Sequence, residues 1–421
     1  MRRAFVGFGR RSRWWVLVAV SAVLGGGLVL PEPAVAGADL LQARAEARGG
    51  DRPAAILLGD SYASGEGGRW EGNGPGAVDR GVFQTYGGTW DYPAILPGNA
   101  GGCHRSDVAV IYPYETFEAL DLARNKVNVA CGGAEIKHVL TDSFKGEKPQ
   151  IEQLKERLTQ NPGIKYVVLS VGGNDAGVSG VAQECVKKFV LKQSAGLKQV
   201  SAAEGEKYQA YVQGLKESDK NLVCAASPEL SGLEGKLEHV YETLFKEAIS
   251  PLAPDAQLVV LNYPNPLPAA DSELRGPLES NLVSRLQDGG CPFFDKDFAK
   301  FAGIAKDING TIQNAVTAAA KNNVPIHLLD VSGMYQGHEV CASGTTQDKE
   351  WIRQVPADLL SDPGLIHEAL HPNAFGQRME GKCVSNFLDE LSSRATKSAN
   401  EHGVCQDNAN VQVKAPGNTT R

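Results

Sequence analysis

The sequence predicts an α/β fold in which a central parallel sheet is covered by helices on both faces. Short apolar runs without a helical period are typical of buried strands, and longer amphipathic segments separate several of them. This alternation is the pattern of parallel strands joined by helical crossovers. The expected strands are residues 54–58, 127–130, 165–171, 257–262 and 325–331. The expected helices are residues 149–160, 233–248, 298–319 and 375–391.

Length and composition are those of a folded chain. It has 421 residues, of which 42% are hydrophobic and 22% charged, so it can form one large domain or two ordinary ones with a packed core. The formal net charge is −7, which argues against a nucleic-acid-binding protein, because such a protein needs a basic face for phosphate.

The N-terminus is typical of an export signal. A start with five arginines precedes the apolar run Trp14–Leu30, and the small residues Ala34–Ala36 provide a cleavage site. The alternative is a membrane anchor, but this run is short for a span and contains a glycine triplet. We therefore expect a signal peptide at residues 1–36, a secreted protein, and no membrane span after cleavage.

All eight cysteines follow the expected cleavage site. An even number in an exported chain favours four disulfides, whereas a zinc site is improbable because the sequence contains no C-x-x-C pair. Spacing leaves many pairings open, and our hypothesis is pairing between sequence neighbours. The pairs would be Cys103–Cys131, Cys185–Cys224, Cys291–Cys341 and Cys383–Cys405.

Ser61 stands just past the first expected strand, after Gly59 and Asp60. A serine held there by a rigid strand faces the crevice in which open α/β sheets bind ligands, which suits a nucleophile. The alternative is that Ser61 only caps the next helix, since serine is a favoured N-cap residue.

Three further clusters come after expected strands, the third of them after a loop, and could meet Ser61 at one edge of the sheet. They are Cys131–Ala134, Gly172–Asp175 and His371–Asn373. Taken one by one, the glycines could form only a tight turn, Asn174 could cap a helix, and His371 could be a surface loop residue. Their occurrence at successive strand ends favours an active site.

The chemistry of these residues is complementary. A serine hydroxyl is a weak nucleophile until a base takes its proton, and His371 is the candidate base for Ser61. Glu368 is the candidate acid that orients His371. Acyl transfer builds negative charge on an oxygen, for which the backbone N–H groups of Ser61 and Gly133 and the side-chain NH₂ of Asn174 are candidate donors.

Four sequence blocks carry a resemblance to a known family. GDSYASGEG, ACGGA, GGNDAG and HPNAFG, in this order, resemble the signature blocks of the SGNH (GDSL-type) hydrolases. The block Cys103–Ser106 adds a similarity to the secreted actinobacterial branch, which includes lipases, esterases and phospholipases. The resemblance covers roughly residues 53–392. It implies a three-layer α/β/α sandwich with a flavodoxin-like sheet, Ser61 as nucleophile, His371 as base, and an oxyanion hole of Ser61, Gly133 and Asn174.

Two features depart from the family pattern. The family usually has Asp three residues before the histidine, where this chain has Glu368, and some members use a backbone carbonyl instead. The segments 68–102 and 176–232 are insertions that could shape the acyl or alcohol pocket. The aromatic residues of the first insertion either line a substrate cleft or pack the loop onto the domain; they are Trp70, Phe83, Tyr86, Trp90 and Tyr92.

The resulting hypothesis is a secreted, monomeric serine hydrolase that cleaves lipid or other acyl esters without a cofactor or metal. The alternatives are an acyltransferase or carbohydrate O-deacetylase with the same site, and a non-catalytic binding module. The expected divisions are the signal peptide, a spacer at 37–52, a hydrolase domain at 53–402, and a tail at 403–421 that is mobile apart from Cys405.

Overall fold

The structure is a computed structural model in which the chain divides into two units, residues 1–51 and 52–421. All described residues belong to the second unit. They are residues 54–79, 102–106, 108–111, 126–161, 163–193, 224–269, 285, 289–355, 365–394 and 400–414. The expected signal peptide and spacer lie outside this part. None of the described helices combines the length and the apolar character that a bilayer crossing needs.

The central sheet has seven strands in the order β4-β1-β5-β6-β7-β8-β9. All neighbouring strands pair in parallel except β8 and β9, which are antiparallel. The strands are β1 (Ala54–Gly59), β4 (Lys126–Asn128), β5 (Ile164–Ser170), β6 (Gln257–Leu261), β7 (Ile326–Asp330), β8 (His402–Cys405) and β9 (Val411–Lys414). The five expected strands are therefore confirmed, with small shifts at their ends.

The strand order creates a topological switch between β1 and β5. From β1 the chain passes to β4 on one side, whereas β5 and the next strands are added on the other side. Connections after β1 and β5 therefore leave in opposite directions, and a crevice opens at the carboxyl ends of these two strands, where open α/β sheets bind ligands. Both expected site blocks that follow these strands, with Ser61 and Asn174, lie at this point.

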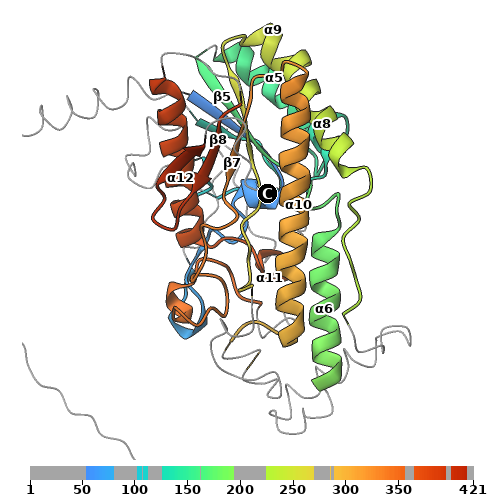
Figure 1. Ribbon diagram of the computed structural model, residues 1–421, viewed down its shortest axis with the longest axis vertical. Coiled ribbons are helices and arrows are strands. Elements are labelled where there is room, and N and C mark those ends of the chain that lie inside the picture. The colour runs from blue at the N-terminus through green and yellow to red at the C-terminus, as the bar shows by residue number, and fades with distance from the viewer. Residues whose placement is uncertain are drawn as a thin grey trace, which may run out of the picture. The chain divides into compact units, whose positions relative to one another are not determined.

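Helices cover both faces of the sheet, as the sequence predicts. On one side α4, α5, α8 and α10 pack against one another, and α12 lies across the sheet from α10 (Figure 1). The main helices are α4 (Ile136–Leu140), α5 (Gln150–Gln160), α8 (Leu233–Leu244), α10 (Asp295–Lys321) and α12 (Ala374–Ser393). Around them lie α2 (Ser61–Ser64), α6 (Val178–Gln193), a π-helical turn η4 (Phe245–Ile249), α9 (Ser250–Leu252) and α11 (Leu365–Glu368).

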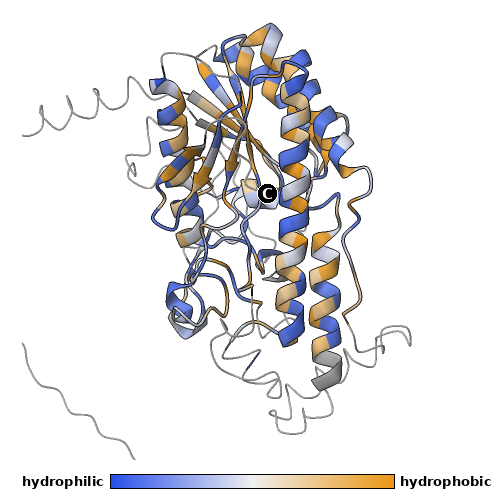
Figure 2. Ribbon diagram, viewed as in Figure 1, coloured by the Kyte–Doolittle hydropathy of each residue, from blue (hydrophilic) through white to orange (hydrophobic). Residues whose placement is uncertain are grey.

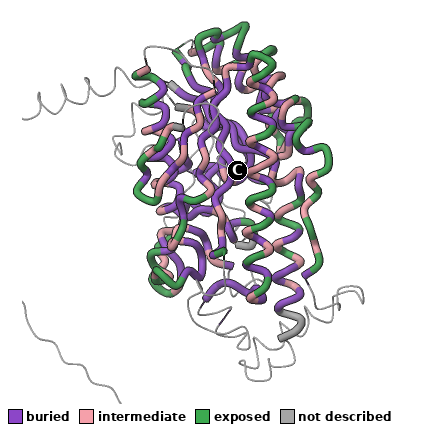
Figure 3. The backbone as a smooth tube through the Cα atoms, viewed as in Figure 1, coloured by how far each residue is buried: buried purple, intermediate pink, exposed green. Residues whose placement is uncertain are grey.

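The core lies between the sheet and these helices. Strand residues such as Leu57, Val168 and Val260 are almost fully buried because both faces of a parallel sheet are covered. Apolar residues of the helices form stripes that face the strands, with polar residues outside (Figure 2). Figure 3 shows the same division as a buried interior under partly exposed helices.

The carboxyl end of β1 makes a close contact with β5. Gly59 has a φ of 134°, and a Cβ atom at this position would lie 1.9 Å from the carbonyl oxygen of Ser170. Gln150 on α5 bonds both backbone groups of Gly59 with its side-chain amide, at 2.7 and 2.8 Å. Only glycine fits here, and the turn that follows is therefore placed tightly against the β5 end.

The expected mobile tail is wrong for residues 403–414. They belong to the β8–β9 hairpin, which extends the sheet beyond β7 and is tied to α12 by the disulfide Cys383–Cys405. The prediction was based on the polar character of these residues. An edge hairpin can nevertheless be polar, because it needs to bury only one of its two faces. Its buried face is marked by Gly403, which packs against Phe387.

The two insertions are partly described. Residues 68–79 contain a small antiparallel pair, β2 (Trp70–Glu71) and β3 (Val78–Asp79), with a 3₁₀ turn between them, η1 (Gly74–Gly76). The second insertion contributes α6. Residues 80–101 and 194–223, including four aromatic residues of the first insertion, lie outside the described part. The four disulfides join sequence neighbours: Cys103–Cys131, Cys185–Cys224, Cys291–Cys341 and Cys383–Cys405.

Candidate active site

Ser61 is the first residue of α2, directly after β1 and Asp60. The Asp60 carboxylate caps this short helix by accepting a hydrogen bond from the N–H of Tyr62 at 3.0 Å. Ser61 is buried except for 8% of its surface, and it lines a cavity at the carboxyl edge of the sheet. The N-capping role considered for Ser61 belongs to Asp60, which leaves the serine hydroxyl available.

His371 lies in the turn between α11 and α12. Asn373 caps α12 through the N–H groups of Phe375 and Gly376 and donates to the carbonyl of Glu350 at 2.6 Å. The backbone of His371 accepts from the N–H of Arg353 at 2.8 Å. The imidazole is therefore mounted on a turn that is fixed at both ends.

The residue before the histidine is in an unfavourable backbone conformation. Leu370 has a φ of 63°, in the left-handed region that costs a non-glycine residue roughly 1–2 kcal/mol. Its N–H donates to the carbonyl of Arg353 at 2.9 Å, and its carbonyl accepts from the hydroxyl of Tyr62 at 2.7 Å. The Tyr62 ring also packs against the imidazole of His371, with centroids 4.8 Å apart. These contacts hold the turn and aim the imidazole at Ser61.

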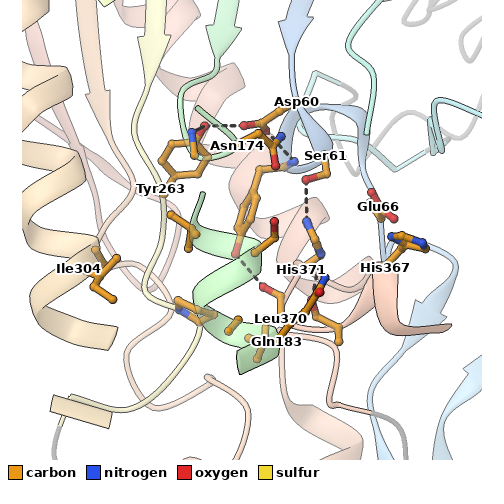
Figure 4. A pocket seen from close by; sticks show the side chains of 18 of the residues that line it. Asp60, Ser61, Glu66, Asn174, Gln183, Tyr263, Ile304, His367, Leu370 and His371 are labelled. Carbon is orange, nitrogen blue, oxygen red and sulfur yellow. Dashed lines mark hydrogen bonds between the residues drawn. The ribbon is translucent and has the colours of Figure 1, made fainter. Parts of the chain in front are cut away.

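Ser61 and His371 form a hydrogen-bonded pair. The Nε2 atom of His371 lies 2.7 Å from the hydroxyl oxygen of Ser61, although 310 residues separate them (Figure 4). Its other ring nitrogen, Nδ1, lies 3.1 Å from the carbonyl oxygen of Ala369. A carbonyl only accepts, so Nδ1 carries the proton and Nε2 is free to accept the Ser61 hydroxyl proton.

Glu368 does not orient His371 as the sequence analysis expected. Its carboxylate accepts from the indole N–H of Trp70 at 2.6 Å and pairs with the Nε of Arg69 at 3.0 Å. The planar guanidinium of Arg353 covers the Trp70 ring at 4.0 Å. This buried cluster packs the first insertion onto the domain, which is the second of the two interpretations of Trp70. The spacing of three residues predicted contact, but the end of α11 turns the carboxylate away, and the carbonyl of Ala369 takes its place.

The three candidate oxyanion donors line the same cavity. Within the described residues, the backbone N–H groups of Ser61 and Gly133 donate to no protein acceptor. Asn174 donates one amide hydrogen to the carbonyl of Ala134 at 2.9 Å, which leaves its second hydrogen. Gly133 has a φ of 84°, so the peptide orientation at this point favours glycine, whereas a Cβ would meet no atom closer than 3.7 Å.

Tyr263 connects the Ser61 turn with the Asn174 loop. Its hydroxyl donates to the carboxylate of Asp60 at 2.5 Å and accepts from the N–H of Gly173 at 3.0 Å. Burial raises the pKa of Asp60 to about 7, although the hydrogen bonds from Tyr263 and from the N–H of Tyr62 oppose this shift. One phenol therefore sets the spacing between the two loops that carry Ser61 and Asn174.

Glu66 is a buried carboxylate beside the histidine. The Nδ1 atom of His104 lies 2.9 Å from it, and its other oxygen faces Gly132. Burial opposes its ionisation, but the hydrogen bond from His104 and the positive charge of the neighbouring imidazole rings in their protonated form outweigh burial and lower the pKa of Glu66. Burial also lowers the pKa of His371, and the Glu66 charge and the Ala369 carbonyl only partly offset this. His371 is therefore neutral, as a general base must be before it accepts a proton. The neighbouring Glu66 anion stabilises the protonated form that His371 adopts afterwards.

The cavity has a volume of about 460 Å³ and extends beyond the Ser61–His371 pair. Four of the five residues predicted for catalysis line it: Ser61, Gly133, Asn174 and His371. Its remaining walls come mainly from α6 and α10, and Tyr62 packs against His371. Tyr263 and Glu66 lie near the reactive pair (Figure 4). Such a volume suits a small organic ligand or one acyl chain.

Sequence reasoning missed Tyr62, Glu66, Tyr263 and Ala369. Tyr62 and Glu66 stand inside the block GDSYASGEG, and Tyr263 directly follows an expected strand, so their positions were a usable signal. Ala369 acts through its backbone carbonyl, an alternative to Glu368 that the family resemblance allowed but that the sequence could not assign to a particular residue. Among the described residues, the cluster with potential metal ligands is Cys185, Cys224 and Asp297, and its two cysteines are joined in a disulfide.

Comparisons with known proteins point to bacterial lipases. The chain is 25% identical over 323 residues to a lipase from Streptomyces rimosus and 29% identical over 322 residues to lipase 1 from Streptomyces coelicolor. Each match covers 76% of this chain and 81% of the relative. No protein-family model matches the chain.

Two solved structures are also similar. The extracellular lipase from Streptomyces rimosus superposes with a TM-score of 0.42 and 22% identity, over 80% of this chain and 98% of the lipase. Phospholipase A1 from Streptomyces albidoflavus NA297 gives 0.43 and 22%, over 82% and 100%. The sequence matches identify the chain as a distant relative of Streptomyces lipases.

Proposed function

We propose that this chain is a secreted serine hydrolase of the SGNH type that cleaves carboxylic esters of lipids or other acyl groups. The observation that carries the proposal is the 2.7 Å contact between Ser61 Oγ and His371 Nε2, with Nδ1 facing a carbonyl acceptor. The distant similarity to lipases supports an ester substrate. Four disulfides and the export signal expected from the sequence support secretion.

In the proposed reaction, Ser61 attacks the ester carbonyl while its proton passes to Nε2 of His371. The tetrahedral intermediate collapses when the carbon–oxygen bond to the alcohol breaks, and the imidazolium returns the proton to the departing alkoxide. The acyl group is then bound to Ser61. A water molecule attacks this ester, gives its proton to His371, and the acid is released as Ser61 regains its proton.

The negative charge of the intermediate falls on the former carbonyl oxygen. The N–H groups of Ser61 and Gly133 and the free amide hydrogen of Asn174 are the proposed donors. Removal of one such donor typically costs about 3 kcal/mol of transition-state stabilisation. The positive charge on His371 is stabilised by the Ala369 carbonyl and by the Glu66 carboxylate. No acid in direct contact with Nδ1 is required.

Replacement of Ser61 by alanine tests the proposal. We expect Ser61→Ala to abolish hydrolysis of p-nitrophenyl esters, a loss of at least about 10³-fold, because no nucleophile remains. Circular dichroism should show an unchanged fold, since the position tolerates a small residue. A fluorophosphonate probe should label the wild-type chain at Ser61, as identified by peptide mass spectrometry.

Unchanged turnover in Ser61→Ala would refute the assignment. Absence of probe labelling in a folded wild-type chain would instead favour the non-catalytic binding module. Thr141→Ala, in an exposed position of the same domain, serves as the control that should retain both labelling and turnover.

A further inference from the structure

The block Cys103–Ser106 has no part in the proposed reaction, yet all four of its residues are buried beside the site. One end of the block contacts the short helix that begins at Ser61. The N–H of Ser106 donates to the carbonyl of Ser64, the last residue of this helix, at 2.9 Å. The contact is close, since a Cβ atom at Gly65 would lie 2.8 Å from the Cβ of Ser106. The block is therefore fixed against the segment that carries the serine.

The other end of the block holds the loop that carries Gly133. Cys103 is joined to Cys131 by a disulfide, and its carbonyl accepts from the N–H of Gly132 at 2.9 Å. Ser61 and Gly133 belong to segments that follow two different strands, β1 and β4. The block thus bridges the two segments that supply the candidate backbone donors for an oxyanion.

Arg105 is the residue of the block that makes most of its polar contacts with the Gly133 loop. Its Nε donates to the carbonyl of Ala130 at 2.7 Å, and its Nη2 donates to the carbonyl of Val129 at 3.2 Å. Nη1 and Nη2 also contact the two carboxylate oxygens of Glu147, Nη1 at 2.7 Å. Arginine offers these donors in one rigid plane. The buried guanidinium is therefore charge-balanced and holds two successive carbonyls.

The backbone leading to Gly133 is fixed residue by residue. Four consecutive N–H groups donate to protein acceptors: Val129 to Leu57, Ala130 to Asn128, Cys131 to Gly59 and Gly132 to Cys103. The carbonyls of Val129 and Ala130 accept from Arg105. The next N–H is that of Gly133, which donates to no acceptor among the described residues. The loop is thus held on both backbone edges up to the residue before the candidate donor.

Such fixation matters because an oxyanion donor acts only when it is already in place. The donor has to lie about 3 Å from the oxygen that becomes charged, and it must not need to reorganise during the reaction. A misplacement of about 1 Å can cost roughly 100-fold in rate. Without Arg105, the buried carbonyls of Val129 and Ala130 would lack their donors, and the loop would shift to satisfy them.

We propose that Arg105 is a positioning residue for ester hydrolysis, which holds the Gly133 loop so that the Gly133 N–H meets the oxyanion. This inference depends on the proposed function and deepens it. Arg105 acts through the backbone of Val129 and Ala130 and touches no substrate. Lysine cannot take its place, because a single ammonium group cannot bridge two carbonyls and a carboxylate in one plane.

The test compares p-nitrophenyl butyrate with its thionoester, in which sulfur replaces the carbonyl oxygen. Sulfur accepts hydrogen bonds weakly, so the ratio of the two kcat/KM values measures what the oxyanion donors contribute. We expect Arg105→Ala to lower kcat/KM for butyrate by about 10- to 100-fold and to change that for the thionoester little. The ratio should therefore fall at least about tenfold. A loss of folded protein would lower both values equally and leave the ratio unchanged.

The matched control is Arg378→Ala, which removes another arginine–carboxylate contact, the one with Glu71 at 2.7 Å on α12. Its ratio should equal that of the wild type. Circular dichroism and fluorophosphonate labelling establish that each variant is folded with a reactive serine. If Arg105→Ala does not fold, Arg105→Lys provides the measurement, because it keeps the charge beside Glu147. Its ratio should fall at least about threefold.

The outcomes separate this inference from the proposed function. A wild-type chain that is labelled and hydrolyses butyrate, with an Arg105→Ala variant that loses both substrates equally or neither, overturns the role of Arg105 alone. A folded Arg105→Lys variant with the wild-type ratio also overturns it, since the planar fork would then be unnecessary. Absence of both labelling and turnover in the wild-type chain would contradict the proposed function first.

Discussion

Glu66 is the charged residue with the clearest consequence for the proposed base. It is 4% exposed, and it shares the cavity with His371. Because Glu66 is anionic, it favours the imidazolium that forms when His371 accepts the serine proton. Glu66 would thus stabilise the imidazolium through its charge alone, whereas in other serine hydrolases an acid that is hydrogen-bonded to the histidine does so.

Replacement of Glu66 by glutamine should change the pH profile. Loss of the negative charge lowers the pKa of His371 further below its ordinary value of 6.5, so the acidic limb of kcat/KM should move to lower pH. The value of kcat should fall by roughly tenfold, the equivalent of about 1.4 kcal/mol of lost transition-state stabilisation. The measurement is kcat and kcat/KM between pH 4 and 9.

Glu368→Gln is the matched comparison. It also removes a buried carboxylate, but one that contacts Arg69 and Trp70 rather than His371. We expect it to reduce the stability of the chain while the acidic limb stays in place. If Glu368→Gln moved this limb and Glu66→Gln did not, the assignment of the electrostatic partner would be wrong.

The β8–β9 hairpin completes the edge of the sheet, although its polar sequence does not indicate this. β8 covers the edge of β7 through the pairs Leu328–His402, Leu329–Gly403 and Asp330–Val404. Cys405 is joined to Cys383 on α12, which fixes the hairpin to the helical layer. Without it, β7 would be an exposed edge strand and the Phe387 side of α12 would lose its cover.

Truncation after Asn400 should therefore destabilise the chain. Loss of one native disulfide alone typically costs about 2–5 kcal/mol, and the unpaired edge of β7 adds to this. We expect a lower midpoint in urea-induced unfolding and a stronger tendency to aggregate. Truncation after Lys414, which removes no described strand, is the control.

The double variant Cys383→Ser/Cys405→Ser separates the contribution of the disulfide from that of the hairpin itself, since it removes the disulfide but keeps the hairpin. If truncation after Asn400 left the urea midpoint unchanged, the hairpin would contribute nothing to the stability of the fold, and residues 403–414 would behave as the mobile tail expected from the sequence.

Buried titratable groups make the stability of the folded chain depend on pH. Burial raises the pKa of Glu380 to about 7, although the Tyr335 hydroxyl donates to it. Burial lowers the pKa of His327 to about 4. Between their ordinary and folded values, the folded chain binds more protons at Glu380 and fewer at His327 than the unfolded chain does.

Glu380→Gln should become progressively more stable than the wild type as the pH rises from 5 to 8. A raised folded pKa gives a carboxyl group stability that is present at low pH and lost as the pH approaches 7. Glutamine keeps the acceptor for Tyr335 and has no charge to bury. The gain at pH 8 relative to pH 5 should be on the order of 2 kcal/mol in the free energy of unfolding by urea.

His327→Gln should show the opposite trend and is the companion control. A lowered folded pKa gives histidine a stability that is present above pH 6.5 and lost as the pH falls toward 4, so removal of the group favours the variant at low pH. A stability difference between Glu380→Gln and wild type that does not vary with pH would contradict the raised pKa.

The sequence alone was sufficient to predict the layers and the principal strands. Short runs such as QLVVL and KYVVLS contain no helical period, and parallel strands buried on both faces need uniformly apolar residues. It also predicted that Ser61, Gly133 and Asn174 lie at one sheet edge, because each follows a strand. These inferences need only local periodicity and the direction of parallel strands. His371 comes well after β7, between α11 and α12, and its place beside Ser61 was expected from its chemistry as a base and from the block HPNAFG.

Tertiary structure decided the group that orients His371, the direction of Glu368, and the β8–β9 hairpin. Each depends on where distant segments meet: the Arg69–Trp70 cluster holds Glu368, a backbone carbonyl faces the imidazole, and β7 provides the edge for β8. A linear sequence shows which side chains are available. Long-range packing and burial determine which of them touch. The turn at Leu370, for example, directs the side chains of Glu368 and His371 to different partners, although the two residues are only three positions apart.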